Sequence, residues 1–122
     1  MEIKVVKQDG REIASACGKE KCIVDTRSAL DFVMTVKYET GLDRIAMEKG
    51  LIAEDFFILS TGMAGEILQK FVNYHVKAAI WGDYSRYTSK PLRDFIYESN
   101  CGKDFFFVAS QKEALARLAA LE

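Results

Sequence analysis

Two neighbouring hydroxyl side chains, Ser60 and Thr61, stand directly before a segment with the apolar spacing of an amphipathic helix. This position brings the hydroxyls close to the free N–H groups of the first helical turn, where a phosphate or another anion is stabilised. Ser60 and Thr61 are therefore candidate phosphoacceptors, in a turn that also contains Gly62 and Gly65. The alternative is that Ser60 or Thr61 only caps the helix, and that the two glycines permit close packing.

A second group of polar and aromatic residues follows the apolar run at 76–81. Asp83 is predicted to form a charged cluster with Arg86 and Arg93, while Tyr84 and Tyr87 add an exposed aromatic surface suited to recognition. Together with the two glycines of the preceding turn, these five residues are a candidate partner or ligand surface. The alternative is a solvated loop with a local ion pair.

Residues that would support catalysis or metal binding are sparse. His75 is the only histidine, and its place beside the start of a strand favours a surface or helix-terminal role over that of a catalytic base. Cys17, Cys22 and Cys101 are interpreted as reduced thiols, with a zinc site including His75 or a disulfide across the first hairpin as lesser alternatives. We predict no catalytic residue, no metal site and no cofactor.

Composition and charge exclude several classes of protein. The 122 residues are 49% hydrophobic and 29% charged, which is typical of one globular domain spanning 1–122. The 17 basic and 18 acidic side chains nearly cancel, so nucleic acid is an unexpected partner. The longest apolar runs, at 78–81 and 105–109, are far shorter than the roughly 20 residues of a membrane helix. Residues 1–8 lack the apolar core of a signal peptide, which predicts a cytoplasmic protein.

The secondary-structure elements that position these residues are predicted from hydrophobic periodicity and from the turn and capping residues between the periodic segments. Alternation around Asp9-Gly10 predicts a hairpin whose return strand is 11–17, and 22–24 is a candidate third strand. Helices are predicted at 26–39, 63–74, 90–101 and from 111 onward, with strands at 42–48, 76–81 and 104–109. Residues 53–59 are too irregular to assign, and Glu54-Asp55 is interpreted as a solvated helix start. Ser110 and Glu113 match a capping box.

The predicted order is two strands followed by alternating helices and strands. Such an order indicates an α/β domain with a mixed sheet, in which the N-terminal hairpin is antiparallel and the later strands are parallel. The loops beyond the carboxyl ends of the parallel strands are then the expected place for a site.

Four segments, SALD at 28–31, VKYETG at 36–41, STGMAGEILQKF at 60–71 and YTSKPLRDFIY at 87–97, resemble an uncharacterised bacterial family described only as a domain of unknown function. The resemblance covers almost the whole chain and implies no activity.

A more distant resemblance is to STAS domains, which include anti-sigma factor antagonists. The turn 60–65 is similar to the Asp-Ser-Ser-Gly-Leu-Gly turn that opens the second helix of those domains, although Leu59 stands at the acidic position and Ala64 adds one residue. The closing segment 105–115 matches their last strand and helix in pattern. In antagonists a serine of the turn is phosphorylated by a partner kinase, which implies Ser60 or Thr61 as the acceptor here.

The sequence thus favours a non-enzymatic regulatory or protein-interaction domain, in which phosphorylation of the turn before the second helix switches binding of another protein. An alternative is a small-molecule binder or enzyme, with Ser60, Thr61, Asp83, Arg86 and Tyr87 lining a crevice at the strand ends. A third hypothesis is a homodimer or other homo-oligomer.

Overall fold

The chain opens with an antiparallel hairpin. The computed structural model describes residues 1–121, and its first two strands are β1 (Glu2–Gln8) and β2 (Arg11–Cys17). Asp9 and Gly10 both have positive φ, 50° and 83°, as the favoured two-residue hairpin turn requires. The predicted hairpin is confirmed.

Helices and strands then alternate in the predicted order. They are α1 (Thr26–Thr40), β3 (Arg44–Glu48), α2 (Met63–Asn73), β4 (Lys77–Trp81), α3 (Lys90–Cys101), β5 (Phe105–Val108) and α4 (Gln111–Ala120). The predicted mixed α/β architecture is therefore confirmed, with small differences at the ends of the elements, where helices fray and assignments vary.

The irregular stretch after β3 consists of three short 3₁₀ helices, η1 (Lys49–Leu51), η2 (Glu54–Phe57) and η3 (Leu59–Thr61). The candidate strand at 22–24 is wrong, because the segment makes only one isolated bridge, between Ile23 and Ile52. Its backbone instead follows the turn after β3: the N–H groups of Cys22 and Ile23 both donate to the carbonyl of Leu51.

The helix starts follow from their capping residues. Asp25 accepts from the N–H of Ser28, and the Ser28 hydroxyl accepts from the N–H of Asp25, so α1 begins with a capping box. Ser89 caps α3, with a proline in the first turn. At α4 only half of the predicted box forms: Ser110 accepts from the N–H of Glu113, with no reciprocal bond.

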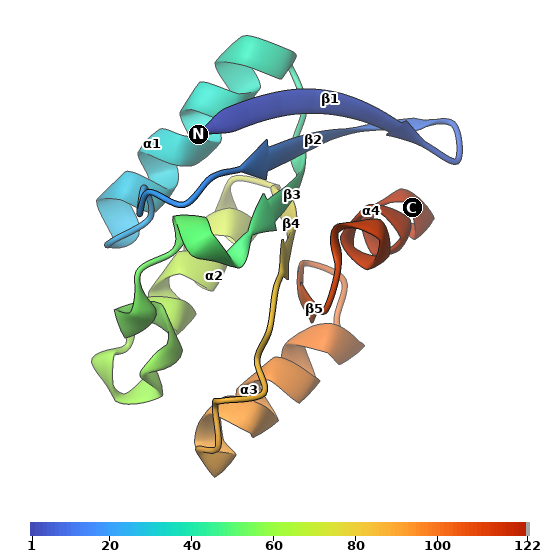
Figure 1. Ribbon diagram of the computed structural model, residues 1–122. Helices are drawn as coiled ribbons and strands as arrows, with labels where there is room; N and C mark the ends of the chain where they lie inside the picture. The colour runs from blue at the N-terminus through green and yellow to red at the C-terminus, as the bar shows by residue number, and fades with distance from the viewer. Residues whose placement is uncertain (122) are drawn as a thin grey trace.

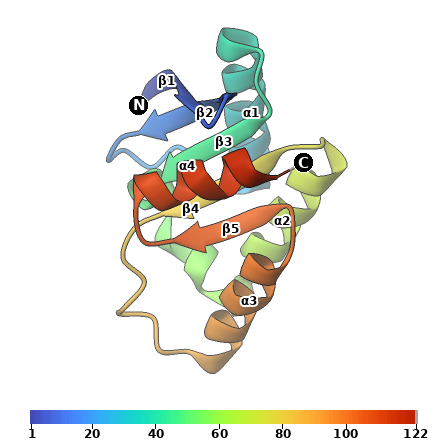
Figure 2. The same cartoon turned by 90° about the vertical axis from the view of Figure 1, so that its right-hand side faces the viewer.

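The five strands lie side by side in the order in which they occur in the chain, β1-β2-β3-β4-β5. The pairs from β2 to β5 are all parallel. Figures 1 and 2 show α1 and α2 on one side of the sheet and α4 on the other. Helix α3 packs on the same side as α1 and α2, since Leu92 joins their core.

Each face of the sheet has its own apolar core. The larger core joins α1, α2 and α3 to strand residues that include Met47, Ile80 and Phe107, and it is rich in phenylalanine. The smaller one joins α4 to Ile13 and Phe106. None of the helices in residues 1–121 has the length and hydropathy needed to cross a membrane.

Candidate functional site

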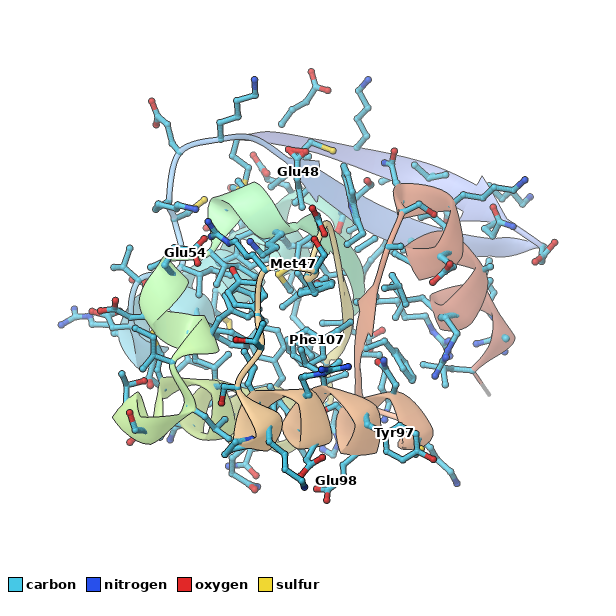
Figure 3. The ribbon with its side chains drawn as sticks, turned by 60° about the horizontal axis from the view of Figure 1, so that its bottom comes forward. Met47, Glu48, Glu54, Tyr97, Glu98 and Phe107 are labelled. Atoms are coloured by element: carbon cyan, nitrogen blue, oxygen red, sulfur yellow. The ribbon has the colours of Figure 1, made fainter. Side chains whose placement is uncertain are left out.

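The connections after β4 and β5 part at the carboxyl ends of these strands. The chain leaving β4 reaches α3 on one face of the sheet, whereas the chain leaving β5 reaches α4 on the other face. Divergent connections of this kind leave room for a site at the strand ends. Figure 3 shows this region, with Glu54 on η2 and Tyr97 on α3.

The two hydroxyls of the turn before α2 differ in their bonding. Thr61 Oγ1 lies 3.1 Å from the carbonyl oxygen of Asp55 and 2.9 Å from that of Ile58, and it accepts from the N–H of Met63 at 3.2 Å. Ser60 is exposed, and its hydroxyl forms no hydrogen bond within residues 1–121. Of the two candidate phosphoacceptors, only Ser60 therefore has a free hydroxyl.

The interpretation of this turn as a tightly packed cap is wrong in two respects. The N-cap of α2 is Gly62, with φ of 79°, rather than Ser60 or Thr61. A Cβ built on Gly65 meets no other atom within 4 Å, so this glycine serves no close packing. Gly62 is needed for its left-handed backbone conformation, which L side chains rarely adopt.

The predicted cluster of Asp83 with Arg86 and Arg93 does not form in residues 1–121. Asp83 accepts from the N–H of Ser85 at 2.8 Å, a local turn bond that lowers the pKa of its carboxyl group. Arg86 pairs instead with Glu54, and Arg93 pairs with no carboxylate of the described chain.

Glu54 is the centre of the charged cluster, and the sequence interpretation missed it. Its carboxylate pairs with Arg86, accepts a hydrogen bond of 2.7 Å from Tyr87 Oη, and lies 3.5 Å from Lys49 Nζ. Partial burial alone would raise the pKa of Glu54, but the Tyr87 hydrogen bond and the two cations lower it overall. These contacts join η1, η2 and the β4–α3 loop.

The two tyrosines of the loop do not form the exposed aromatic surface that was predicted. Tyr84 is largely buried, its Oη donates to the carbonyl of Ile80 at 2.8 Å, and burial raises its pKa. The Tyr87 ring stacks on Phe57, with 5.0 Å between ring centroids, and Lys49 Nζ lies 4.9 Å from the Tyr87 centroid. Both rings pack against the larger apolar core. Burial of their apolar surface explains why they point toward the core although their neighbours in the loop are polar.

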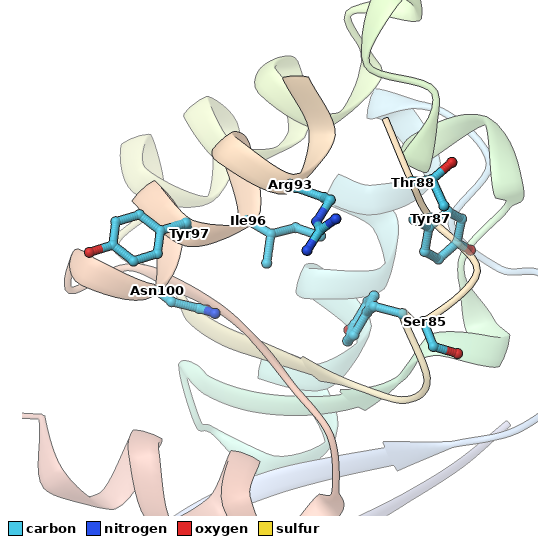
Figure 4. Close-up of a pocket in the computed structure, with 8 residues that line it drawn as sticks. Ser85, Tyr87, Thr88, Arg93, Ile96, Tyr97 and Asn100 are labelled. Carbon is cyan, nitrogen blue, oxygen red and sulfur yellow. The ribbon is translucent and has the colours of Figure 1, made fainter. Parts of the chain in front are cut away.

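Two hollows flank this stack of Phe57 and Tyr87. The first, which we call the Ser60 groove, has a volume of about 480 Å³ and is lined by Phe57, Ile58, Leu59, Ser60, Ser89 and Pro91. The second, the Arg93 hollow, has a volume of about 380 Å³ and is lined by Tyr84, Ser85, Tyr87, Thr88, Arg93, Ile96, Tyr97 and Asn100. Figure 4 shows the Arg93 hollow, with Arg93 extending from α3.

The predicted crevice lining is therefore divided. Ser60 lies in one hollow and Tyr87 in the other, while Thr61, Asp83 and Arg86 line neither. The residues that the alternative hypothesis named therefore do not line a single pocket, because the Phe57–Tyr87 stack lies between the two hollows.

The remaining chemistry-bearing residues do not converge on this region. His75 is exposed at the end of α2, with φ of 59°. Cys17, Cys22 and Cys101 are free thiols. Within the described residues, no three histidine, cysteine, aspartate or glutamate side chains come together as a metal would require.

The fold and the site define a small α/β domain with a mixed five-stranded sheet and two hollows at its carboxyl edge. A family profile matches residues 8–118, and the chain belongs to this family, DUF4180, described as a domain of unknown function. No curated protein and no solved structure matches the chain.

Proposed function

We propose that the chain is a bacterial, cytoplasmic, STAS-like protein-interaction domain without enzymatic activity, which docks a partner protein in the Ser60 groove. The observation that carries the proposal is the apolar character of this groove. Ile58 is 52% exposed at its rim, and Phe57, Leu59 and Pro91 complete the apolar lining. An exposed apolar side chain beside an apolar hollow is typical of a protein contact.

The partner is a protein that presents an apolar anchor side chain. No charged side chain lines the groove, and of the two carboxylates of the nearby η2 segment, Glu54 is already paired with Lys49 and Arg86, while Asp55 is exposed outside the groove lining. Burial of an anchor such as leucine contributes about 1.5–3 kcal/mol, whereas a charged anchor would be desolvated without a counterion.

Phosphorylation of Ser60 is the proposed switch. A kinase would transfer the terminal phosphoryl group of ATP to Ser60 Oγ, releasing ADP and the hydroxyl proton. The product carries a charge of about −1.5 to −2, placed at the rim of an apolar groove, where it opposes docking of the anchor. The free, exposed hydroxyl of Ser60 and the resemblance of the turn 60–65 to that of STAS domains support this proposal.

Site-specific photocrosslinking tests the contact. A photoreactive phenylalanine analogue at Ile58, compared with one at Val72, identifies polypeptides that contact the groove in bacterial cells. Val72 is a matched control because it is also an exposed, β-branched residue, 41% exposed on α2. The partner is then purified, and its affinity is measured against wild type, Ile58→Asp and Val72→Asp.

We expect Ile58→Asp and Ser60→Glu to weaken partner binding at least tenfold, and Val72→Asp and Ser60→Ala to leave it unchanged. Equal affinity of Ile58→Asp and Val72→Asp would contradict the groove. Identical binding by phosphorylated and unmodified protein would contradict the switch. Crosslinks only to a second copy of this chain would contradict binding of a different protein and would indicate a homodimer.

A further inference from the structure

The Arg93 hollow has the properties of a ligand site distinct from the proposed partner groove. It lies between the β4–α3 loop and one side of α3, and its walls come from segments that the fold holds in place (Figure 4). Its volume of about 380 Å³ falls within the range of small-molecule pockets, about 300–1,000 Å³.

Three polar side chains of the wall are already used by the fold. Tyr84 donates to the carbonyl of Ile80, and Tyr87 donates to Glu54. Asn100 binds the backbone of Phe107 twice: its Nδ2 donates to the carbonyl at 3.0 Å, and its Oδ1 accepts from the N–H at 2.7 Å. The single hydroxyl protons of Tyr84 and Tyr87 are therefore already used, and Asn100 is held in place by the backbone of Phe107.

Other polar side chains of the wall are not used in this way. Within residues 1–121, the side chains of Arg93, Thr88 and Tyr97 form no hydrogen bond and no ion pair. No carboxylate lines the hollow, and the nearest acidic residue on the helix, Asp94, pairs with Lys90 at 2.7 Å. The hollow therefore combines the unpaired cation of Arg93 with the free hydroxyls of Thr88 and Tyr97.

The position of Arg93 on its helix strengthens the positive potential. The N–H of Arg93 donates to the carbonyl of Ser89, the N-cap, so Arg93 lies at the positive end of α3, a helix without an acidic residue in its first turn. A cation here is not favoured by the helix dipole, whereas a bound anion interacts favourably with both the guanidinium and the dipole.

We propose that the Arg93 hollow binds a small aromatic carboxylate. The planar guanidinium matches a carboxylate through two parallel hydrogen bonds. The rings of Tyr84 and Tyr87 and the side chain of Ile96 supply apolar wall for a flat body. A cavity of about 150 Å³ accommodates benzene, so the hollow has room for one or two fused rings with a carboxylate.

Titration with 2-naphthoate, followed by amide chemical shifts of the isotope-labelled protein, tests this proposal. We expect saturable shifts confined to residues 84–100, and at least tenfold weaker binding of the neutral analogue 2-naphthamide. Arg93→Met keeps the length and the apolar stem of the side chain and should weaken naphthoate binding at least tenfold. Arg27→Met, at another exposed arginine, is the matched control and should bind as wild type does.

Each contrary result overturns the proposal. Absence of saturable shifts in residues 84–100 would show that the hollow holds no ligand of this class. Equal binding of naphthoate and naphthamide, or unchanged binding by Arg93→Met, would show that the guanidinium does not recognise an anion. Ile58→Asp should leave naphthoate binding unchanged, so failure of the partner groove and failure of this site are distinguished.

Discussion

Arg86, in the β4–α3 loop, and Arg93, in the first turns of α3, differ in whether their guanidinium groups have partners. Arg86 pairs with Glu54, donates to Tyr87 Oη at 3.2 Å, and has its guanidinium carbon 5.2 Å from the centre of the Tyr87 ring. Arg93, seven positions later, lines a hollow and pairs with nothing in the described chain. The contrast teaches that the first charge is used to hold segments together, while the second is available for binding.

The largest expected effect comes from Tyr87, which contacts Arg86 and also lines the Arg93 hollow. Tyr87→Ala should lower the free energy of unfolding by about 3 kcal/mol, because it removes the stack on Phe57 and the hydrogen bond to Glu54. Urea denaturation at pH 7 measures this loss. Tyr97→Ala, at a side chain that is 70% exposed, is the control and should change stability by under about 0.5 kcal/mol. Equal losses in both variants would contradict the structural role that we assign to Tyr87.

Asn100 lines the Arg93 hollow but is expected to act in folding, because its side chain bonds to the backbone of Phe107. Asn100→Ala should cost about 2 kcal/mol, because it leaves a backbone N–H and a carbonyl of Phe107 without partners. The control is Asn73→Ala, which loses only an exposed bond with Gln69. Thermal and urea unfolding of the pair should separate them clearly; similar stability would mean that water replaces Asn100 without cost.

Glu54→Gln tests whether Arg86 and its neighbours act through charge. Because the folded-state pKa of Glu54 lies below its ordinary value of 4.5, its stabilisation is present above that pH and is lost as the pH falls through the folded-state pKa. The variant should therefore be less stable than wild type by about 1 kcal/mol at pH 7, with the gap closing in acid.

Asp55→Asn is the matched control for Glu54→Gln, since Asp55 is the neighbouring exposed carboxylate and has no ion pair within residues 1–121. Urea denaturation of the three proteins from pH 7 to pH 3 gives the comparison. A gap that stays constant with pH would show that Glu54 acts only through packing.

The smallest expected effect is that of Arg93→Met on stability. An unpaired, exposed side chain contributes little to folding, so the free energy of unfolding should change by under about 0.5 kcal/mol, even though naphthoate binding is expected to fall. Calorimetric unfolding without ligand checks this. A large destabilisation would show that Arg93, like Arg86, has a structural role.

The order of the elements was predictable because each helix or strand has a signal in its own local sequence. Asp9-Gly10 supplies the positive φ of a hairpin, and apolar residues of α2 such as Ile67 and Phe71 recur at helical spacing. The stretch at 53–59 was not assignable, because η2 and η3 are too short to show any period. Its irregular backbone nevertheless buries Phe56 and Phe57.

The site was harder to predict because its partners are distant in sequence or are backbone groups. Tyr87 and Glu54 are 33 positions apart, and nothing in either local pattern says which loops meet. Asn100 bonds to the backbone of Phe107, which any residue type would supply, so no sequence signal marks it. Tyr84 stands between polar residues but packs edge-on against Phe107, 5.9 Å between centroids, since tertiary contacts override a polar neighbourhood.

The sequential strand order also affects how the molecule forms during synthesis. Each strand pairs only with the strands before and after it in the chain, so the sheet can grow from the N-terminal hairpin outward, one crossover at a time, with short loop closures. Helix α4 is synthesised after all five strands and covers Ile13 and Ala46 on the second face, where Arg44 bonds to the carbonyls of Leu118 and Leu121. Until that helix leaves the ribosome, the nascent sheet exposes an apolar face, and this is the stage at which the chain is most exposed to aggregation and chaperone capture.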